Sequence, residues 1–337
     1  MFKLFFITGT LLSLLVQDIS EKKLNDSIVH LKENYTRPSF DIKEFCTADY
    51  SIFLYAQKFA QGNVVYVEII PADSSVVSQK MIMLNDNIPV YLSKFLWGYR
   101  GFFALCPDEA PGEKLVTLEY TTGEKPEKYF FPFSISKSNF PVSHTALKVG
   151  KYSDVNNAKD SQIVKFIIEC SEKKKKAFSR TGPDMLRATL SKPRNILSIT
   201  SPFWSSRIYE RYEIKNNKRI ELPSQTKTHK GIDLRGRKGD PVFALADGEV
   251  ILAENMYYEG NLTVIDHGNR IMTYYMHQDS ILVHAGQIVH AGDTIGKVGA
   301  TGVSTAPHLH LSLVIDGVQV DPLSILPLPI RDSSRSD

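Results

Sequence analysis

The sequence is poor in cysteine, has no large excess of charge of one sign and contains no apolar run of transmembrane length. Its 337 residues include 3 cysteines, and no two of them have the Cys-x-x-Cys spacing of a thiolate zinc site. A disulfide-dense scaffold is therefore excluded, and any metal must use histidine and carboxylate ligands. Lysine and arginine number 40 against 37 acidic residues, a net charge of +3. This near balance argues against nucleic-acid binding.

The remaining composition is that of an ordinary globular protein, with 42% hydrophobic and 23% charged residues. These values exclude wholesale disorder and collagen-like repeats. At about 150 residues per domain, the length predicts two domains.

The first 20 residues have the features of a secretory signal peptide. Lys3 precedes an apolar stretch over residues 4–16, which is shorter than the roughly 20 residues that span a bilayer. Residues 14–17 lack the small residues of a cleavage site, so we predict that residues 1–20 are a signal peptide or an uncleaved anchor. The alternative is a buried N-terminal strand or helix. We expect an exported protein of the periplasm or cell envelope, which meets a membrane only through this segment if it stays uncleaved.

Residues 46–150 contain seven short apolar runs separated by turn sequences such as Gly62-Asn63 and Thr122-Gly123. This spacing predicts an N-terminal antiparallel β-sandwich of immunoglobulin-like architecture. The runs cover residues 51–56, 64–70, 76–84, 89–92, 102–106, 115–120 and 129–136. The polar residues 21–45 before them are predicted to be a linker, with a short helix over 20–32 as the alternative.

The cysteines leave two possibilities open. An oxidising compartment would permit a Cys46–Cys106 disulfide. Alternatively, these two and Cys170 are three unrelated thiols.

Residues 151–195 are predicted to be a helical connector. Within residues 155–180 an apolar stripe recurs with helical spacing at Ile163, Phe166, Ile167 and Cys170. The basic run over residues 173–176 is interpreted as a solvated helix end rather than a membrane or polyanion site.

Histidine is concentrated near the C-terminus, with seven of the nine between His229 and His310. In a strand, alternate side chains share a face, so His229, Gly231 and Asp233 would present an imidazole and a carboxylate together. Gly231 leaves room between the two polar side chains. An imidazole and a carboxylate make half of a zinc site.

A second histidine cluster follows near the end of the chain. His308, His310 and Ser312 alternate strictly with Leu309, Leu311 and Leu313. Two histidines on one strand face, each backed by leucine, indicate a metal or catalytic site rather than packing. A third element, residues 273–277, also alternates and ends at His277.

These three elements, in this order, resemble the zinc peptidases of the lysostaphin and LytM type, the M23 family. The resemblance covers residues 199–326. It is carried by ten ordered blocks, at residues 229–233, 239–244, 246–250, 260–264, 267–268, 275–277, 286–289, 292–296, 299–302 and 307–310.

The resemblance implies a mainly β protein whose residues 196–330 form an antiparallel β peptidase domain of LytM type, followed by a tail over 331–337. It implies one zinc ion per chain, held by His229, Asp233 and His310, with water as the fourth ligand. His277 and His308 would be the two non-ligand histidines: one would act as general base on the water, and the other, or both, would stabilise the oxyanion, without the resemblance deciding which. His267, His284 and His290 lie outside these roles and are expected in turns.

The chain departs from the family pattern before the first ligand. The family often has a Ser-x-Phe-Gly-x-Arg block there, whereas residues 201–207 place Trp204 near the usual glycine. A long polar segment over residues 209–228 follows. Both departures are expected to reshape one wall of the substrate groove.

The resemblance implies a zinc endopeptidase that hydrolyses peptide cross-links of bacterial peptidoglycan through a zinc-activated water. Its substrate would be the stem peptides, and other envelope proteins are possible partners. One alternative is a non-catalytic regulator that binds peptidoglycan and activates another wall hydrolase, as family members without zinc ligands do. Another is an adhesion module with a structural zinc site, although such sites have four protein ligands and only three are evident here. The family resemblance leaves the scissile bond open, since carboxypeptidase trimming fits the same site.

Overall fold

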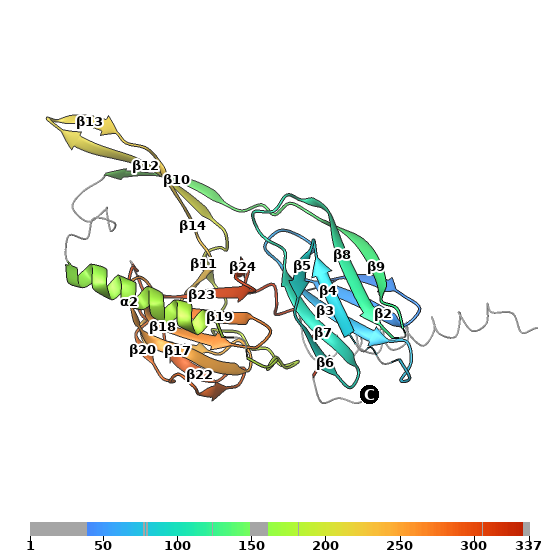
Figure 1. The fold of residues 1–337 in the computed structure, drawn as a ribbon. Helices are drawn as coiled ribbons and strands as arrows, with labels where there is room; N and C mark the ends of the chain where they lie inside the picture. The colour runs from blue at the N-terminus through green and yellow to red at the C-terminus, as the bar shows by residue number, and fades with distance from the viewer. Residues whose placement is uncertain are drawn as a thin grey trace, which may run out of the picture. The chain divides into compact units, whose positions relative to one another are not determined.

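A computed structural model describes residues 39–76, 78, 80–122, 124–148, 161–180, 182–304 and 306–332. The predicted signal peptide or anchor, the alternative helix over 20–32 and residues 333–337 of the predicted tail over 331–337 lie outside the described residues. The chain divides into Met1–Ser39 and Phe40–Asp337, and the described residues belong almost entirely to the second unit. This unit is mainly β, as expected (Figure 1). Within the described residues, no helix has the length and apolar character needed to cross a membrane.

Two sheets pack face to face in the N-terminal half. The first has the strand order β1-β2-β3-β7-β6 and the second β5-β4-β8-β9. A shared apolar cluster lies between them because alternate residues of each strand point inward, as Phe131, Phe133 and Ile135 of β9 do. The bounds are β1 (Asp41–Cys46), β2 (Tyr50–Ala56), β3 (Val64–Pro71), β4 (Lys80–Asn85), β5 (Ile88–Val90), β6 (Leu92–Phe95), β7 (Gly98–Ala104), β8 (Gly112–Thr121) and β9 (Glu127–Ile135).

The predicted apolar runs therefore mark strands, but the predicted linker extends too far. Its last residues begin β1, an edge strand that pairs with β2. Phe45 of β1 stacks on Phe131 at 4.9 Å between ring centroids, a contact that exists only once the second sheet is in place. The immunoglobulin-like topology stays a prediction. Cys46, Cys106 and Cys170 are free thiols, so the Cys46–Cys106 disulfide is not formed.

The predicted connector contains α2 (Ser161–Phe178), whose apolar side packs on β17 (Gly248–Met256) and β18 (Gly260–Asp266). Phe166, Cys170 and Ala177 form this side. Phe166 and Cys170 belong to the predicted helical stripe, whereas its other two residues, Ile163 and Ile167, are half-buried and lie outside the cluster. Two lysines of the basic run form surface ion pairs, Lys173 with Glu254 and Lys174 with Glu259.

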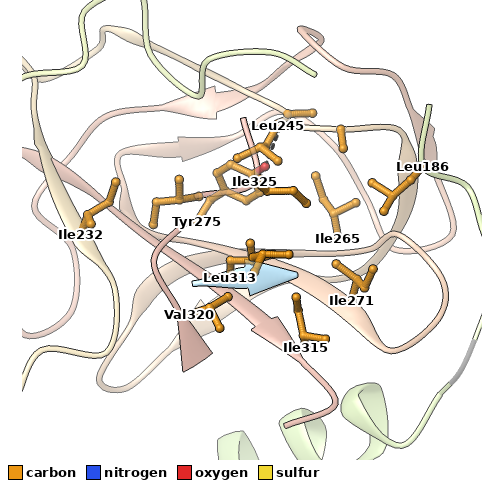
Figure 2. Packing of buried hydrophobic residues seen from close by; sticks show 14 of the residues in the cluster. Leu186, Ile232, Leu245, Ile265, Ile271, Tyr275, Leu313, Ile315, Val320 and Ile325 are labelled. Atoms are coloured by element: carbon orange, nitrogen blue, oxygen red, sulfur yellow. Dashed lines mark hydrogen bonds between the residues drawn. The ribbon is translucent and has the colours of Figure 1, made fainter. Parts of the chain in front are cut away.

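The C-terminal half contains a large antiparallel sheet of order β11-β15-β23-β19-β18-β17-β21, with β24 also paired to β23. A small sheet of order β16-β22-β20 accompanies it. Figure 2 shows Leu245, Tyr275 and Ile325 packed together in the interior. The remaining bounds are β11 (Ile199–Ser201), β15 (Ile232–Arg235), β16 (Pro241–Phe243), β19 (Ile271–Gln278), β20 (Ser280–Ile281), β21 (Ile288–Val289), β22 (Thr294–Lys297), β23 (His308–Ile315) and β24 (Val318–Val320).

The two halves share part of their interior. Tyr55, Tyr66 and Phe102 of the sandwich belong to the same apolar cluster as the core of the C-terminal half. The Ser324 hydroxyl also accepts a hydrogen bond from the backbone of Val64 at 3.1 Å. A fragment limited to residues 190–337 would expose this surface, so functional experiments should use the full chain.

A buried ion pair ties the sandwich to the connector. The fully buried guanidinium of Arg100 donates two hydrogen bonds to Asp184, at 2.7 and 2.6 Å, and others to the carbonyl oxygens of Leu186 and Arg331. Removing one member of a buried pair leaves the other charge without compensation, which typically costs about 3–5 kcal/mol.

We therefore expect Arg100→Met to lower the free energy of unfolding by about 3–5 kcal/mol, measured by urea denaturation. The double variant Arg100→Met/Asp184→Leu should recover part of this loss because it leaves no unpaired charge. A loss below about 1 kcal/mol in the single variant, the range of a surface ion pair, would contradict this account.

A separate small sheet joins strands from both sides of α2. β10 (Val142–Lys148) pairs in parallel with β12 (Ser206–Lys215), which pairs with β13 (Lys218–Glu221) and β14 (Gln225–Thr228). None of its described residues belongs to a hydrophobic core cluster. The long polar segment of the sequence thus forms the β12–β13 hairpin, drawn in yellow in Figure 1, and β14.

Candidate metal centre

Three neighbouring chain segments bring the predicted ligands together. In the register of β15 and β23, Asp233 lies directly opposite His310, and Arg235 lies opposite His308. His229 precedes β15 and is not in a strand, which corrects the expectation that residues 229–233 alternate along one strand. Two backbone hydrogen bonds hold it instead, from Trp204 N to its carbonyl and from its N–H to the Ser205 carbonyl.

The three ligand atoms converge on one point. His229 Nε2 lies 3.0 Å from Asp233 Oδ1 and 2.9 Å from His310 Nδ1, and His310 Nδ1 lies 2.9 Å from Asp233 Oδ1. Ligands of a tetrahedral zinc ion are about 3.3 Å apart, given metal–ligand distances of 2.0–2.2 Å. The donor set therefore fits a metal ion, and a fourth position is left for water or substrate.

The hydrogen bonds on the far side of each ring fix which nitrogen faces the centre. His229 Nδ1 donates to the Pro202 carbonyl at 3.0 Å, and His310 Nε2 lies 3.0 Å from the Ser312 hydroxyl. That hydroxyl donates to the Lys230 carbonyl, so it accepts from His310. Both ligand nitrogens thus present a lone pair to the centre. Such outer contacts orient the ligands of metal sites.

Ser312 is the outer contact that can be removed with least disturbance. We expect Ser312→Ala to weaken metal binding about 10- to 100-fold, because His310 loses the acceptor that fixes its orientation. Competition with a chelating dye measures the affinity, and Ser191→Ala, on a loop away from the centre, is the matched control. Unchanged affinity in Ser312→Ala would contradict the orienting role.

The two non-ligand histidines border the same centre. His308 Nε2 lies 3.4 Å from Asp233 Oδ1, and the ring centroids of His277 and His308 are 5.0 Å apart. His308 Nδ1 donates to the Ala306 carbonyl and His277 Nδ1 to the Thr301 carbonyl, both at 2.8 Å. In their neutral forms both rings therefore keep Nε2 free to accept a proton.

His277 reaches the centre through an unusual backbone conformation. Strand alternation would place it on the same face as Tyr275, which is fully buried in the core. Its φ of 62° lies in the left-handed region and breaks this alternation at the end of β19. Strained backbone of this kind is concentrated at functional sites.

Electrostatics favours an ionised carboxylate at the centre. Burial alone would raise the pKa of Asp233, but the close contacts of its carboxylate with the imidazoles of His229, His308 and His310 outweigh burial and hold that pKa far below its usual range. Burial lowers the pKa of His277 and of His310, whereas for His308 the contact with Asp233 outweighs burial and raises the pKa.

Two backbone positions explain residue choices around the ligands. A Cβ on Gly231 would lie 2.4 Å from the Leu311 carbonyl oxygen and 2.6 Å from both His310 Nε2 and the Ser312 hydroxyl. This glycine therefore makes room for residues of β23, and not, as the sequence suggested, between His229 and Asp233. Trp204 has a φ of 55°, the conformation for which glycine is best suited.

The three other histidines between His229 and His310 lie outside the centre. His284 and His290 are exposed, and His290 pairs with Asp247 at 3.1 Å. His267 is buried and lies 2.7 Å from the Asp247 carbonyl. Sequence reasoning missed the backbone carbonyls that orient the rings, because every residue has one. The sequence pattern placed Ser312 on the same strand face as His308 and His310 but assigned it no role. Its position two residues after His310 was the signal that it could contact the His310 ring.

Comparison with known proteins finds relatives of the C-terminal half of the chain. The sequence model of peptidase family M23 matches residues 227–322. The peptidoglycan DD-endopeptidase ShyA of Vibrio cholerae is 38% identical over 125 residues, which are 34% of this chain and 29% of that protein. The murein hydrolase activator NlpD of Escherichia coli is 41% identical over 100 residues, 29% of this chain and 26% of NlpD. The chain thus matches less than a third of the length of these relatives.

A solved structure has a similar fold over most of the chain. A crystal structure described as a peptidase M23 from Pseudomonas aeruginosa aligns with a TM-score of 0.54 at 22% identity, over 80% of this chain and 96% of the other. At this identity the likeness concerns the fold alone.

Proposed function

Since the chain contains a peptidase family M23 domain, we propose that it is a zinc-dependent endopeptidase that hydrolyses peptide cross-links of bacterial peptidoglycan. The observation that supports this most directly is the set of five side chains at one centre. Three of them, His229, Asp233 and His310, converge as ligands, and His277 and His308 border them with Nε2 free.

Each side chain has a defined task in this proposal. His229, Asp233 and His310 hold one zinc ion, which when bound supplies Lewis-acid polarisation of a carbonyl and acidifies water. His308 takes a proton at Nε2 from the attacking water and delivers it to the leaving amine. Burial lowers the pKa of His277, and the negative charge that develops on the oxygen of the tetrahedral intermediate would favour a proton on His277 Nε2. The protonated ring would then donate a hydrogen bond to that oxygen. The name of the relative ShyA supports a peptidoglycan substrate, and an envelope location follows from that substrate.

Mass spectrometry of muropeptides tests the reaction. Purified cross-linked peptidoglycan is incubated with the full-length, zinc-loaded chain, and the soluble products are separated and weighed. We expect cross-linked dimers to disappear and monomers to accumulate, with product masses that identify the bond. Trimmed monomers with intact dimers would instead indicate a carboxypeptidase.

The regulator hypothesis is the alternative, and similarity to NlpD is the observation behind it. It predicts that the chain alone releases no soluble muropeptides from peptidoglycan. It also predicts that another wall hydrolase releases them faster when the chain is added. The endopeptidase proposal predicts dimer cleavage by the chain alone.

A further inference from the structure

The two faces of the β12–β13–β14 sheet differ sharply in charge. Paired residues of adjacent strands share a face, so the register puts Arg207, Lys215, Lys218 and Lys227 on one side, which is called the basic face below. Arg211 lies on the same side between Arg207 and Lys215. All four residues of the basic face are exposed.

The opposite face is balanced by internal pairs. Arg219 pairs with Glu221 at 2.5 Å and covers the ring of Tyr212 at 3.9 Å. His144 lies 3.1 Å from Glu210. The excess of positive charge is therefore confined to one side of the sheet.

Repulsion between like charges on the basic face is offset only in part by its own residues. Arg207 lies directly opposite Lys227, and Lys215 directly opposite Lys218. Like charges in directly opposed positions destabilise a sheet. Lys215 pairs with Glu213 at 2.8 Å, but no carboxylate of the described residues pairs with Arg207, Lys218 or Lys227. An external anion would relieve both repulsions.

The basic face begins at the metal centre. The Arg207 guanidinium lies 3.4 Å from the Ser201 hydroxyl, which lies 3.2 Å from Nδ1 of the ligand His229. From Arg207 to Lys215, β12 advances eight residues, about 26 Å at the rise of a strand. The turn at Asn216 and Asn217, with φ of 49° and 58°, closes the hairpin tightly and fixes its far end.

We infer that the basic face is a docking surface for the carboxylate groups of a polymeric acidic peptide substrate whose reacting bond lies at the metal centre. The inference rests on the proposed function, because it assigns that substrate a second contact. Its support is charge complementarity and the continuity of the face with the centre. A polymer can span both regions, whereas a small fragment reaches only the centre.

Co-sedimentation with insoluble peptidoglycan tests this surface, in full-length chains that also carry His308→Ala so that the polymer stays uncut. The test variant is Lys215→Gln/Lys218→Gln/Lys227→Gln. The control, Lys58→Gln/Lys80→Gln/Lys137→Gln, removes equal charge from exposed sandwich positions. We expect about tenfold weaker binding for the test variant at low salt, little change for the control, and a smaller difference at high salt because ions screen exposed charges. Peptidoglycan whose carboxylates have been amidated should bind the parent chain as weakly as native peptidoglycan binds the test variant.

Hydrolysis separates this inference from the proposed function. With His308 intact, the test variant should cut soluble muropeptide dimers within about twofold of the parent chain and cut the insoluble polymer about tenfold more slowly. If the test and control variants bind peptidoglycan equally well, the basic face is not a docking surface. The inference is also overturned if the parent chain binds phosphatidylglycerol vesicles but does not bind peptidoglycan. A chain that cuts nothing would overturn the proposed function, while sedimentation would still report on the basic face.

Discussion

Replacing His310 with alanine is expected to remove the metal and the hydrolytic activity together. His310 Nδ1 lies 2.9 Å from the ligand atoms of both His229 and Asp233, so its loss leaves two ligands that cannot enclose an ion. Removing an outer contact that only orients a ligand costs up to about 100-fold in metal affinity. Because His310 is itself a ligand, we expect its loss to lower zinc affinity at least about 100-fold. Hydrolysis of muropeptide dimers should fall at least as far.

The measurement is zinc content after dialysis, beside the rate of dimer cleavage. His290→Ala is the matched control, because it removes an exposed imidazole on the same half of the molecule. His310→Ala protein that keeps one zinc ion per chain would contradict the assigned ligand set.

The second large effect is expected at His308, where activity should fall while the metal stays. Its Nε2 borders the centre, and its Nδ1 is held by the Ala306 carbonyl. Loss of a general base typically costs about 10²–10⁴ in rate, and we expect His308→Ala to fall in this range. Because His308 is not a ligand, the zinc affinity of His308→Ala should stay within about tenfold of that of the parent chain. This change is smaller than the loss of affinity expected when a ligand is removed.

The separation of these two readouts distinguishes a proton-transfer residue from a ligand. His284 is an exposed histidine that contacts only its own turn. The His284→Ala chain should therefore match the parent chain in zinc affinity and in the rate of dimer cleavage. A His308→Ala chain that cleaves dimers at the parent rate would show that His308 does not transfer the proton.

Strand periodicity predicted most of the sandwich because its inward-facing residues are apolar at every second position, as in β9. It could not predict β1, whose residues are mostly exposed or half-buried and whose Phe45 finds its partner on another sheet. The β12–β13 hairpin was visible only as a polar insertion, since neither of its faces joins a core.

The metal centre was easier to predict than its supports. Strict alternation placed His308 and His310 on one face, and the β15–β23 register then set Asp233 opposite His310. The face of His277 depends on a single left-handed backbone angle that no spacing rule contains. The acceptors for three of the four rings are backbone carbonyls, which no side-chain pattern can reveal.

A zinc titration of the metal-free, full-length chain, read out by mass spectrometry of cross-linked muropeptide dimers, tests the central claim most directly. We predict that dimer cleavage rises with added zinc up to one ion per chain and then levels off. The His308→Ala chain should bind the same single ion and leave the dimers intact. A parent chain that holds one zinc ion and cleaves no dimers, or that cleaves them equally well without metal, would contradict the account.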